Sequence, residues 1–473
     1  MDLTQIYSNP ESQQQRYAAL KTELESQGYA FVRYARAPGR VNLISEHTDY
    51  NGYQVSPIAI ENDFVFAIGT KAGSGIVTIQ HMDPSEHPTD SFDSRESAAS
   101  IAHPNGEWSQ YVRAGFHAAR TYNENLSYEF DLLLVGSGTV PLGSGLSSSS
   151  ALTCCSALAF LAFEKEVDKV KLAQMVAKSE ATVAIEGGGM DQAISLNAEL
   201  GKVAVIKFNP LSLSFVKLPE GIRVAVFSSM KDSKKATGDS NFYNTRVAEC
   251  RAGCALLYQK YTKQEFASNV KINMCADIQT LYGKKSPSQM LSESEELPEK
   301  LSLKQLAEQL HYKSVDELMN SLFTTQAGGI LLKNYTDKTQ LTIQKRLNHV
   351  YSEAFRAQMF ERVLSNISDD DHERLHQLSA ISNFMKESHV SCKDDYECSC
   401  QELEEVIRAA TNSGAFCARL TGAGMGGFAV GLIHAQDDEE FMAKMTAFYM
   451  SKGIKNIEDV LFLTDAGIGG GYL

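Results

Sequence analysis

The sequence lacks an excess of positive charge: in 473 residues, 58 Asp and Glu outnumber 44 Lys and Arg, for a net charge of −14. Nucleic acids and anionic membrane surfaces repel an acidic protein, so neither is expected as a partner. Long apolar runs are also absent. The longest apolar-rich stretch, ALTCCSALAFLAF (151–163), contains Thr and Ser and is shorter than a membrane-spanning helix. A small anionic ligand in a locally positive pocket is compatible with this composition.

Export and disulfide signals are missing too. The first twenty residues show no basic segment followed by an apolar one, so no signal peptide is expected. Nine cysteines are an odd number, which favours free thiols in a reducing compartment and predicts a cytoplasmic protein. Cys392, Cys398 and Cys400 lack the paired C-x-x-C spacing of zinc sites, so free thiols are favoured there as well.

The length indicates more than one domain, because a single core rarely organises 473 residues. Apolar residues make up 43% of the chain and charged residues 22%, the balance of a globular protein. A turn-like stretch at 209–221 predicts the main boundary, with an N-terminal domain over 1–215 and a C-terminal domain over 216–473. The polar segment 283–300, which contains two prolines, is expected to be an exposed insertion.

Hydrophobic periodicity and serine caps predict the helices and strands around the informative loops. The predicted helices are 1–30, 149–165, 301–310 and 314–322. The predicted strands are 130–138, 202–208, 223–229, 416–420 and 428–433.

The stretch VPLGSGLSSSSALTCC (140–155) follows a predicted strand and opens a helix. Glycines let the backbone approach a ligand closely, and serines cap the helix start. Free N–H groups and the positive end of the helix dipole then attract an anion such as phosphate. No Lys follows the glycines, so this is not the GxxxxGK[ST] loop. A serine-rich capped helix after a tight turn is the alternative interpretation.

Three other stretches carry candidate residues. GRVNLISEHTDYNGYQ (39–54) crowds an Arg, a Glu, a His and an Asp into a turn-forming context, a polar cluster suited to a polyol. TGAGMGG (421–427) can brace a ligand or another backbone, or form a hairpin bulge. SEATVAIEGGGMDQAIS (179–195) places Asp191 at a predicted helix start, as a candidate general base or magnesium ligand, or as a helix cap.

Together these stretches resemble the GHMP kinases, and APGRVNLISEHTDYNGY (37–53) is similar to the galactokinase signature within that superfamily. PLGSGLSSSSA (141–151) resembles the phosphate loop of the superfamily, and TGAGMGGFAVGL (421–432) its third motif. The resemblance extends from about residue 33 to residue 432. Further stretches resemble the eukaryotic group of galactokinases and N-acetylgalactosamine kinases, namely 186–192, 244–251, 349–356 and 388–400.

The resemblance implies an α+β fold with a mixed-sheet N-terminal domain, a ferredoxin-like C-terminal domain and an active site in the cleft between them. It implies a monomeric kinase that uses ATP and Mg²⁺ to phosphorylate the C1 hydroxyl of galactose. Two alternatives stay open: N-acetylgalactosamine as the substrate, alone or beside galactose, and a catalytically silent sensor that binds ATP and galactose and acts through a protein partner. The presence of Arg40, Asp191 and the serines favours catalysis.

The resemblance also implies roles for single residues. Asp191 is expected to accept the C1 proton, while Arg40 keeps it ionised and stabilises charge on the transferring phosphoryl group. A structural ion pair between them is the alternative. The predicted sugar contacts are Arg40, Glu46, His47, Asp49, Gly188, Asp191 and Tyr243.

The nucleotide is expected to lie on the other side of the site. The predicted phosphate contacts are Gly143, Gly145, Ser147 and Ser148. The predicted magnesium ligands are Ser148 and Glu180, and Trp108 is predicted to contact adenine. Structural roles are the alternatives for His47, Tyr243, Trp108 and Glu180.

Three positions depart from the pattern of the family. The signature usually has glycine where this chain has Ser45, and Met425 and Phe428 replace a tryptophan and a cysteine. Three explanations stay open for Ser45. It adopts a positive φ at a cost on the order of 1 kcal/mol, or it narrows the sugar pocket, or its hydroxyl bonds within the loop and steadies Glu46.

Overall fold

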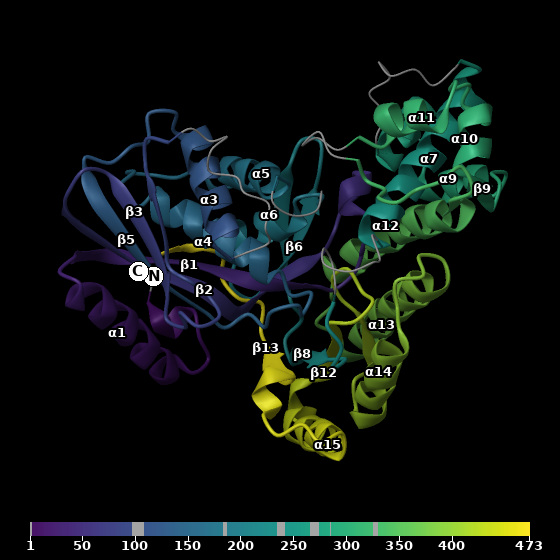
Figure 1. Ribbon diagram of the computed structural model, residues 1–473. Helices are drawn as coiled ribbons and strands as arrows, with labels where there is room; N and C mark the ends of the chain where they lie inside the picture. Colours follow the sequence, from purple (N-terminus) through teal and green to yellow (C-terminus); the bar gives the residue numbers. More distant parts are fainter. Residues whose placement is uncertain are drawn as a thin grey trace.

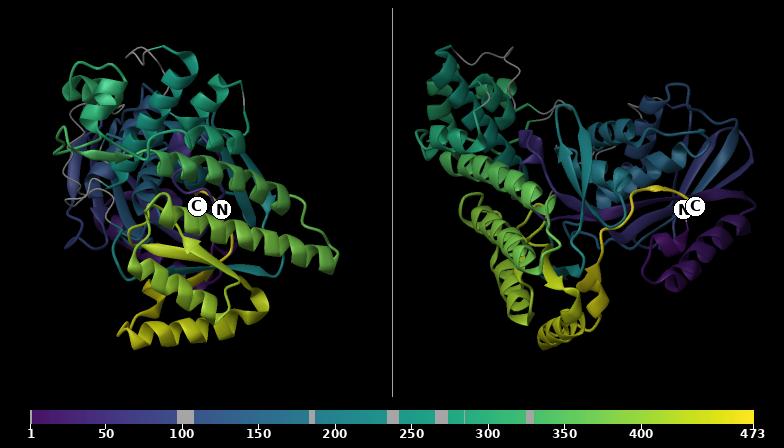
Figure 2. Two further views of the ribbon diagram at one scale, coloured as in Figure 1. Left: turned by 90° about the vertical axis from the view of Figure 1, so that its right-hand side faces the viewer. Right: turned by 180° about the vertical axis from the view of Figure 1, so that it is seen from behind.

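The computed structural model describes residues 2–96, 108–182, 187–233, 242–264, 274–283, 285–324 and 330–473 (Figure 1). The chain forms two main sheets with helices packed on them, and a further group of helices packs beside the second sheet (Figures 1 and 2). The two termini lie close together beside the first sheet (Figure 1). Among the described residues, no helix joins the length and the apolar character that crossing a bilayer demands.

The first sheet combines strands from both ends of the chain. Its order is β14 (Gly471–Tyr472), β1 (Ala30–Asn42), β2 (Pro57–Ala72), β5 (Phe130–Gly138), β3 (Ile76–His81) and β4 (Asp90–Asp93). β3 and β5 run parallel and the other neighbours run antiparallel, so the sheet is mixed. Val65 of β2 packs with α1 (Pro10–Ser26) on one face, and its neighbours Phe64 and Phe66 pack in the core on the other. This alternation is that of a strand buried on both faces.

The face of the sheet opposite α1 carries the helices that build the site. These are α3 (Trp108–Tyr122), α4 (Ser148–Phe160), α5 (Lys169–Glu180) and α6 (Met190–Asn197) (Figure 1). α4 and α6 pack on β1 and β2, and α3 and α5 pack on α4. A hairpin of β6 (Lys202–Lys207) and β7 (Ser212–Lys217) adjoins this layer through a bridge between Val55 and Ile206.

The second sheet is antiparallel. Its order is β11 (Cys417–Leu420), β12 (Phe428–His434), β8 (Ile222–Ser228) and β13 (Leu461–Thr464). α13 (Asp371–Asp394), α14 (Gln401–Ser413) and α15 (Asp438–Ser451) lie against it (Figure 2). The expected α+β fold is confirmed.

The third group is mainly helical and lies beside the second sheet (Figure 1). It contains α7 (Phe242–Thr262), α8 (Cys275–Leu281), α9 (Pro287–Ser294), α10 (Leu303–Gln309), α11 (Val315–Leu322) and α12 (Gln344–Leu364), with a short ladder of β9 (Lys300–Ser302) and β10 (Gln340–Thr342). Short 3₁₀ turns elsewhere in the chain span Leu3–Gln5, Asp49–Asn51, Ala435–Asp437 and Ile457–Asp459.

The predicted helices are confirmed as α1, α4, α10 and α11, although α1 occupies only Pro10–Ser26 of the predicted 1–30. The predicted strands are confirmed as β5, β6, β8, β11 and β12. Ser302 and Ser314 cap α10 and α11 as expected, since their hydroxyls accept the N–H groups of Gln305 and Glu317. All nine cysteines are free thiols, and every one except Cys400 is buried.

Two expectations about polar segments are wrong. The turn-like stretch 209–221 contains β7, which pairs along its whole length with β6. The segment 283–300 is not an exposed insertion, because it contains α9, which packs on α12 and buries Met290. The polar composition of these segments gave no sign of β7 or α9, because an element that buries one face needs only a few apolar side chains. The division at 215/216 stays a prediction; β7 spans it, and β14 returns to the first sheet.

Candidate active site

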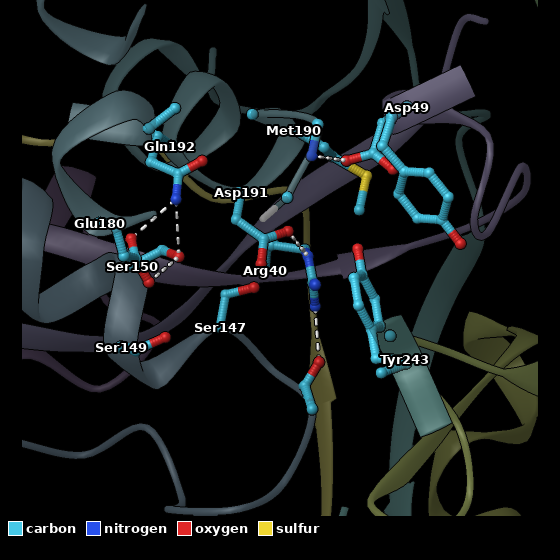
Figure 3. Close-up of a pocket in the computed structure, with 18 of the residues that line it drawn as sticks. Arg40, Asp49, Ser147, Ser149, Ser150, Glu180, Met190, Asp191, Gln192 and Tyr243 are labelled. Atoms are coloured by element: carbon cyan, nitrogen blue, oxygen red, sulfur yellow. Dashed lines mark hydrogen bonds and ion pairs between the residues drawn. The ribbon is translucent and has the colours of Figure 1, made fainter. Parts of the chain in front are cut away.

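A cavity of about 220 Å³ opens where β1, the starts of α4, α6 and α7, and the loop 421–427 meet (Figure 3). It brings together stretches that lie almost 400 positions apart in the sequence. Every residue predicted for the site, Trp108 excepted, lines this cavity, namely Arg40, Glu46, His47, Asp49, Gly143, Gly145, Ser147, Ser148, Glu180, Gly188, Asp191 and Tyr243.

Arg40 and Asp191 form an ion pair at the centre of the cavity (Figure 3). The Arg40 Nε donates to Asp191 Oδ1 over 2.7 Å, and Nη1 donates to the Gly145 carbonyl over 2.6 Å. Burial opposes the charge on Arg40, but Asp191 and Glu46 outweigh that effect and hold the Arg40 pKa above its ordinary value. Asp191 lies in the first turn of α6, where the helix dipole favours a carboxylate.

Asp49 and Gly188 lie in direct contact at the wall of the cavity. The Gly188 N–H donates to Asp49 Oδ2 over 3.1 Å. A Cβ at residue 188 would lie 2.4 Å from both the Asp49 Cγ and the Tyr50 nitrogen, so this approach requires glycine. Burial, followed by the charge of Asp191, raises the pKa of Asp49 from 3.8 to about 6. Asp49 therefore exchanges its proton close to neutral pH.

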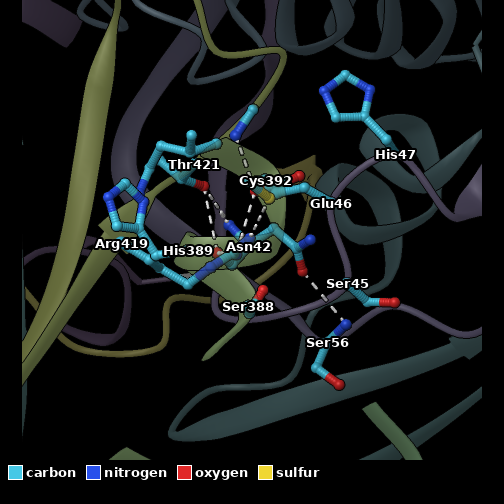
Figure 4. A network of polar contacts seen from close by, with 12 residues as sticks. Asn42, Ser45, Glu46, His47, Ser56, Ser388, His389, Cys392, Arg419 and Thr421 are labelled. Atoms are coloured by element: carbon cyan, nitrogen blue, oxygen red, sulfur yellow. Dashed lines mark hydrogen bonds and ion pairs between the residues drawn. The ribbon is translucent and has the colours of Figure 1, made fainter. Parts of the chain in front are cut away.

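Glu46 and His47 connect the same loop to the loop 421–427. Glu46 Oε1 accepts the Gly422 N–H over 2.8 Å and lies 3.5 Å from Arg419 Nη1 (Figure 4). His47 Nε2 lies 3.2 Å from the Ala423 carbonyl oxygen. Both side chains thus have protein partners while they line the cavity. Their role as sugar contacts stays a prediction.

The loop 421–427 braces the backbone of the phosphate-loop candidate. The Phe428 N–H donates to the Ser144 carbonyl over 2.9 Å. A Cβ on Gly422 would lie 2.5 Å from the Gly145 carbonyl oxygen, and one on Gly427 would lie 2.4 Å from that of Ser144. Of the three readings of this stretch, backbone bracing is the one that these contacts support.

The start of α4 presents serine hydroxyls to the cavity. Ser147 precedes the helix with a φ of 63° in the left-handed region. Its side chain is buried, and its hydroxyl has no hydrogen-bond partner among the described residues. The first N–H groups of any helix also lack partners within the helix. A phosphate oxygen would satisfy both kinds of donor.

Glu180 lies beside these serines. Its Oε1 accepts the Ser150 hydroxyl over 3.1 Å, and its Oε2 accepts the Gln192 amide over 2.7 Å. Burial raises the pKa of Glu180 despite these donors. The structure thereby adds Ser150 and Gln192 to the site; in the sequence, Gln192 follows Asp191 directly and Ser150 lies two positions after Ser148. Within the described ranges, no three His, Cys, Asp or Glu side chains converge as a metal cluster.

Trp108 lies away from the cavity lining. Its indole N–H donates to the Pro88 carbonyl over 2.9 Å, and its ring packs against His81 and His87. Tyr111, one turn further along α3, lines the cavity instead. The contact between Trp108 and adenine stays a prediction.

Family models match three segments of the chain. The galactokinase galactose-binding signature matches residues 25–70, the GHMP kinases N-terminal domain 110–199 and the GHMP kinases C-terminal model 365–450. A galactokinase from Dictyostelium discoideum is 33% identical and aligns over 96% of this chain and 93% of its own length. This chain belongs to the galactokinase family. A galactokinase from Saccharomyces cerevisiae is 30% identical over 84% of this chain and 82% of its own.

Solved structures share the fold of this galactokinase-family chain. A crystal structure of Lactococcus lactis galactokinase complexed with galactose has a TM-score of 0.70 at 20% identity, over 97% of this chain and 99% of that one. A mevalonate kinase has a TM-score of 0.50 at 15% identity, over 93% and 100% of the two chains. The predicted GHMP kinase membership and its galactokinase branch are confirmed. The matched segments run to residue 450, beyond the predicted limit at 432.

Ser45 is the departure from the galactokinase signature that the structure explains. Its φ of 80° lies in the left-handed region, where glycine is usual. Its hydroxyl donates to the Gln54 carbonyl over 2.6 Å and lies 2.5 Å from the Thr48 hydroxyl, and its N–H donates to Glu353 Oε1 over 2.8 Å. Ser45 does not line the cavity. Two explanations therefore hold together, a positive φ and a hydroxyl bonded within the loop, but the hydroxyl steadies Gln54 and Thr48 rather than Glu46.

Proposed function

We propose that this galactokinase-family chain transfers the γ-phosphoryl group of ATP to the C1 hydroxyl of galactose, giving galactose 1-phosphate. The observation that carries this proposal is the Arg40–Asp191 ion pair, which lies between the phosphate-loop candidate and the residues of the sugar signature. A basic group bonded to both a carboxylate and the phosphate loop suits phosphoryl transfer to a hydroxyl. The complete set of groups favours a catalyst over a silent sensor.

In this proposal Asp191 accepts the C1 proton while the hydroxyl oxygen attacks the γ-phosphorus, and the bond from that phosphorus to the β–γ bridging oxygen breaks and releases ADP. Arg40 holds that carboxylate ionised through its Nε and stabilises charge on the transferring group. Its bond to the Gly145 carbonyl keeps the guanidinium against the phosphate loop. Most of the rate is expected from positioning and electrostatic stabilisation rather than from the proton transfer.

The sugar is proposed to bind at the wall of the cavity opposite the phosphate-loop candidate. Asp49 offers carboxylate oxygens to ring hydroxyls, and Glu46 and His47 border the same space. The Tyr243 ring, which lines the cavity, suits the apolar face of galactose. The Gly188 N–H donates to Asp49 in this structure, and it is proposed to change partner and donate to the sugar when galactose binds.

The ATP phosphates are proposed to lie against Gly143, Gly145, Ser147 and Ser148. The unpartnered Ser147 hydroxyl supports this placement. Ser148 and Glu180 would hold Mg²⁺, because hydroxyl and carboxylate oxygens are the ligands it prefers and phosphate oxygens and water complete its shell. When bound, the ion neutralises charge on the phosphates.

N-acetylgalactosamine is a second candidate substrate, favoured by the space around Gly187. A Cβ at residue 187 would meet no described atom within 4 Å. A second cavity, of about 400 Å³, shares Gly187–Gly189 with the active site and continues between Ala173, Ala177 and Ala181. Small side chains there leave room for a substituent on the sugar.

We further propose that the chain works as a monomer in the cytoplasm. The twelve predicted site residues that line the cavity all belong to one chain, which supports a site that a monomer can form. The nine free thiols suit a reducing compartment.

The test is ATP consumption by the purified protein with Mg²⁺, measured separately with galactose, N-acetylgalactosamine and glucose. Turnover with galactose supports the proposal, and turnover with N-acetylgalactosamine alone supports the second candidate. Asp191→Ala should abolish either activity. Binding of ATP and galactose without turnover would replace the kinase proposal with the sensor.

A further inference from the structure

A chain of hydrogen bonds runs from the active-site cavity into the protein interior. His47 Nδ1 lies 2.9 Å from the Tyr50 hydroxyl, which lies 2.6 Å from the Tyr396 hydroxyl. The Cys250 thiol follows, 3.5 Å from the Tyr396 hydroxyl. His47 and Tyr50 line the cavity, whereas Tyr396 and Cys250 are buried behind them. The buried end of this chain therefore has no contact with a ligand in the cavity.

The carbonyl of Ala423 sets the direction of these bonds. A carbonyl oxygen only accepts, so His47 Nε2, 3.2 Å away, carries the proton of the neutral ring. His47 Nδ1 is then an acceptor, and the Tyr50 hydroxyl donates to it. Because the one hydroxyl proton of Tyr50 is used in this hydrogen bond, the Tyr50 oxygen accepts a hydrogen bond from the Tyr396 hydroxyl. Each donor thus fixes the orientation of the next group.

Tyr396 is itself firmly held. Its ring packs against the His47 ring, with the centroids 4.6 Å apart and the planes tilted by 31°, and Arg246 Nε of α7 donates to its carbonyl over 2.8 Å. Tyr396 follows the end of α13, so the chain of hydrogen bonds connects the sugar signature to the C-terminal half of the protein. Fixed rings and buried hydroxyls make this a rigid support.

We propose that Tyr396 is a positioning residue for the sugar site. Its hydroxyl directs the Tyr50 hydroxyl toward His47 and thereby reinforces the Nε2-protonated tautomer that the Ala423 carbonyl favours, with the His47 ring fixed against the cavity. The inference rests on the proposed function, because His47 is a predicted galactose contact. Tyr396 affects galactose binding and leaves the chemistry of Arg40 and Asp191 unchanged.

Tyr396→Phe tests the proposal, because it removes the hydroxyl and keeps the ring. The KM for galactose should rise about fivefold, the effect of one net hydrogen bond, with kcat changed less than about twofold and the KM for ATP unchanged. The control is Tyr449→Phe, which removes a buried hydroxyl that donates to the Ser228 carbonyl over 2.6 Å, outside the cavity. An unchanged galactose KM in Tyr396→Phe, as expected for the control, overturns the proposal.

A double variant tests whether Tyr396 acts through Tyr50. Tyr50→Phe alone should raise the galactose KM, and adding Tyr396→Phe should raise it no further. If the fold-increases in galactose KM of the two single variants multiply in the double variant, the two hydroxyls act independently and the proposal fails.

The nitrogen NMR signals of His47 provide a test that needs no substrate. Ligand-free wild-type protein should show the Nε2-protonated tautomer, and Tyr396→Phe should show a mixture, with His47→Gln used to assign the signals. The same tautomer in both proteins overturns the inference. If the tautomer changes as expected but the wild type does not phosphorylate galactose, the proposed function fails and the support by Tyr396 stands.

Discussion

The Arg40 guanidinium lies 2.7 Å from the Asp191 carboxylate, although 151 positions separate the two residues in the sequence. Arg40 belongs to a strand of the first sheet and Asp191 to the first turn of α6, so their contact depends on how α6 packs on β1. Because Arg40 is almost fully buried, removing Asp191 would take away the carboxylate to which its guanidinium donates and leave the charge poorly compensated.

Asp191→Asn should lower kcat by at least about a hundredfold, because an amide cannot accept the C1 proton. Galactose binding should change far less, since the amide oxygen still accepts a bond from Arg40. Steady-state ATP consumption and calorimetric galactose titration measure the two effects. Asp168→Asn is the matched control, because Asp168 also lies at a helix start, where it caps α5 outside the cavity. Retained turnover in Asp191→Asn would exclude Asp191 as the general base.

Asp49 predicts a pH dependence of sugar binding. Its pKa of about 6 means that the carboxylate, the better acceptor for hydroxyls, forms as pH rises through that value. The KM for galactose should therefore fall between pH 5 and 7. Asp49→Asn should weaken binding and remove this step. If the galactose KM changes with pH equally in wild type and in Asp49→Asn, the change belongs to another titrating group.

The same pKa predicts the sign of a stability change. Since folding raises the pKa of Asp49 from 3.8 to about 6, the folded state holds more protons than the unfolded state between these values. The contribution of Asp49 to stability is present below pH 4 and is lost as pH rises through 6. Urea unfolding of wild type and Asp49→Asn across this range should show the difference, and parallel stability profiles would contradict it.

Gly188→Ala should damage the site, because the new methyl group would lie 2.4 Å from Asp49 Cγ and the Tyr50 nitrogen. We expect a loss of about 1–3 kcal/mol in the free energy of unfolding and a large rise in the galactose KM. Gly187→Ala is the matched neighbour, because its Cβ would meet no described atom within 4 Å. Equal effects of the two substitutions on KM and on urea unfolding would refute the steric argument.

Ser45→Gly should change the galactose KM more than kcat. Glycine relieves the positive φ but loses the hydroxyl bonds to Gln54 and Thr48, so the net change in stability should stay within about 1 kcal/mol. The loop that carries Glu46 and Asp49 becomes less constrained, and we expect a rise of a few-fold in KM. Steady-state kinetics and thermal unfolding measure both. Equal Michaelis constants for the two proteins would refute the hypothesis.

Much of the fold followed from local patterns. The serine caps of α10 and α11 and the apolar run of β5 are properties of neighbouring residues, so they could be predicted without knowledge of the rest of the chain. β7 and α9 were missed because each has one half-buried face in a polar segment. Their stability depends on β6 and α12, which local composition does not report.

The candidate site, too, was predicted from the sequence only in part. Motif resemblance predicted twelve of the residues that line the cavity, from Arg40 to Tyr243. It could not predict that Glu180 is bonded to Ser150 and Gln192, or that His47 is supported by Tyr50 and Tyr396. Nor could it choose between the explanations for Ser45, because that choice depends on φ and on partners up to 308 positions away.

The sequence by itself determined which groups this protein possesses and where its backbone turns, because glycine, serine caps and hydrophobic period act over a few residues. Only the tertiary structure decided how those groups behave. The raised pKa of Asp49, the buried hydroxyl of Ser147 and the support of His47 from Tyr396 all depend on ångström distances between residues far apart in the chain. Electrostatic energies and hydrogen bonds change steeply over such distances, and packing alone sets them.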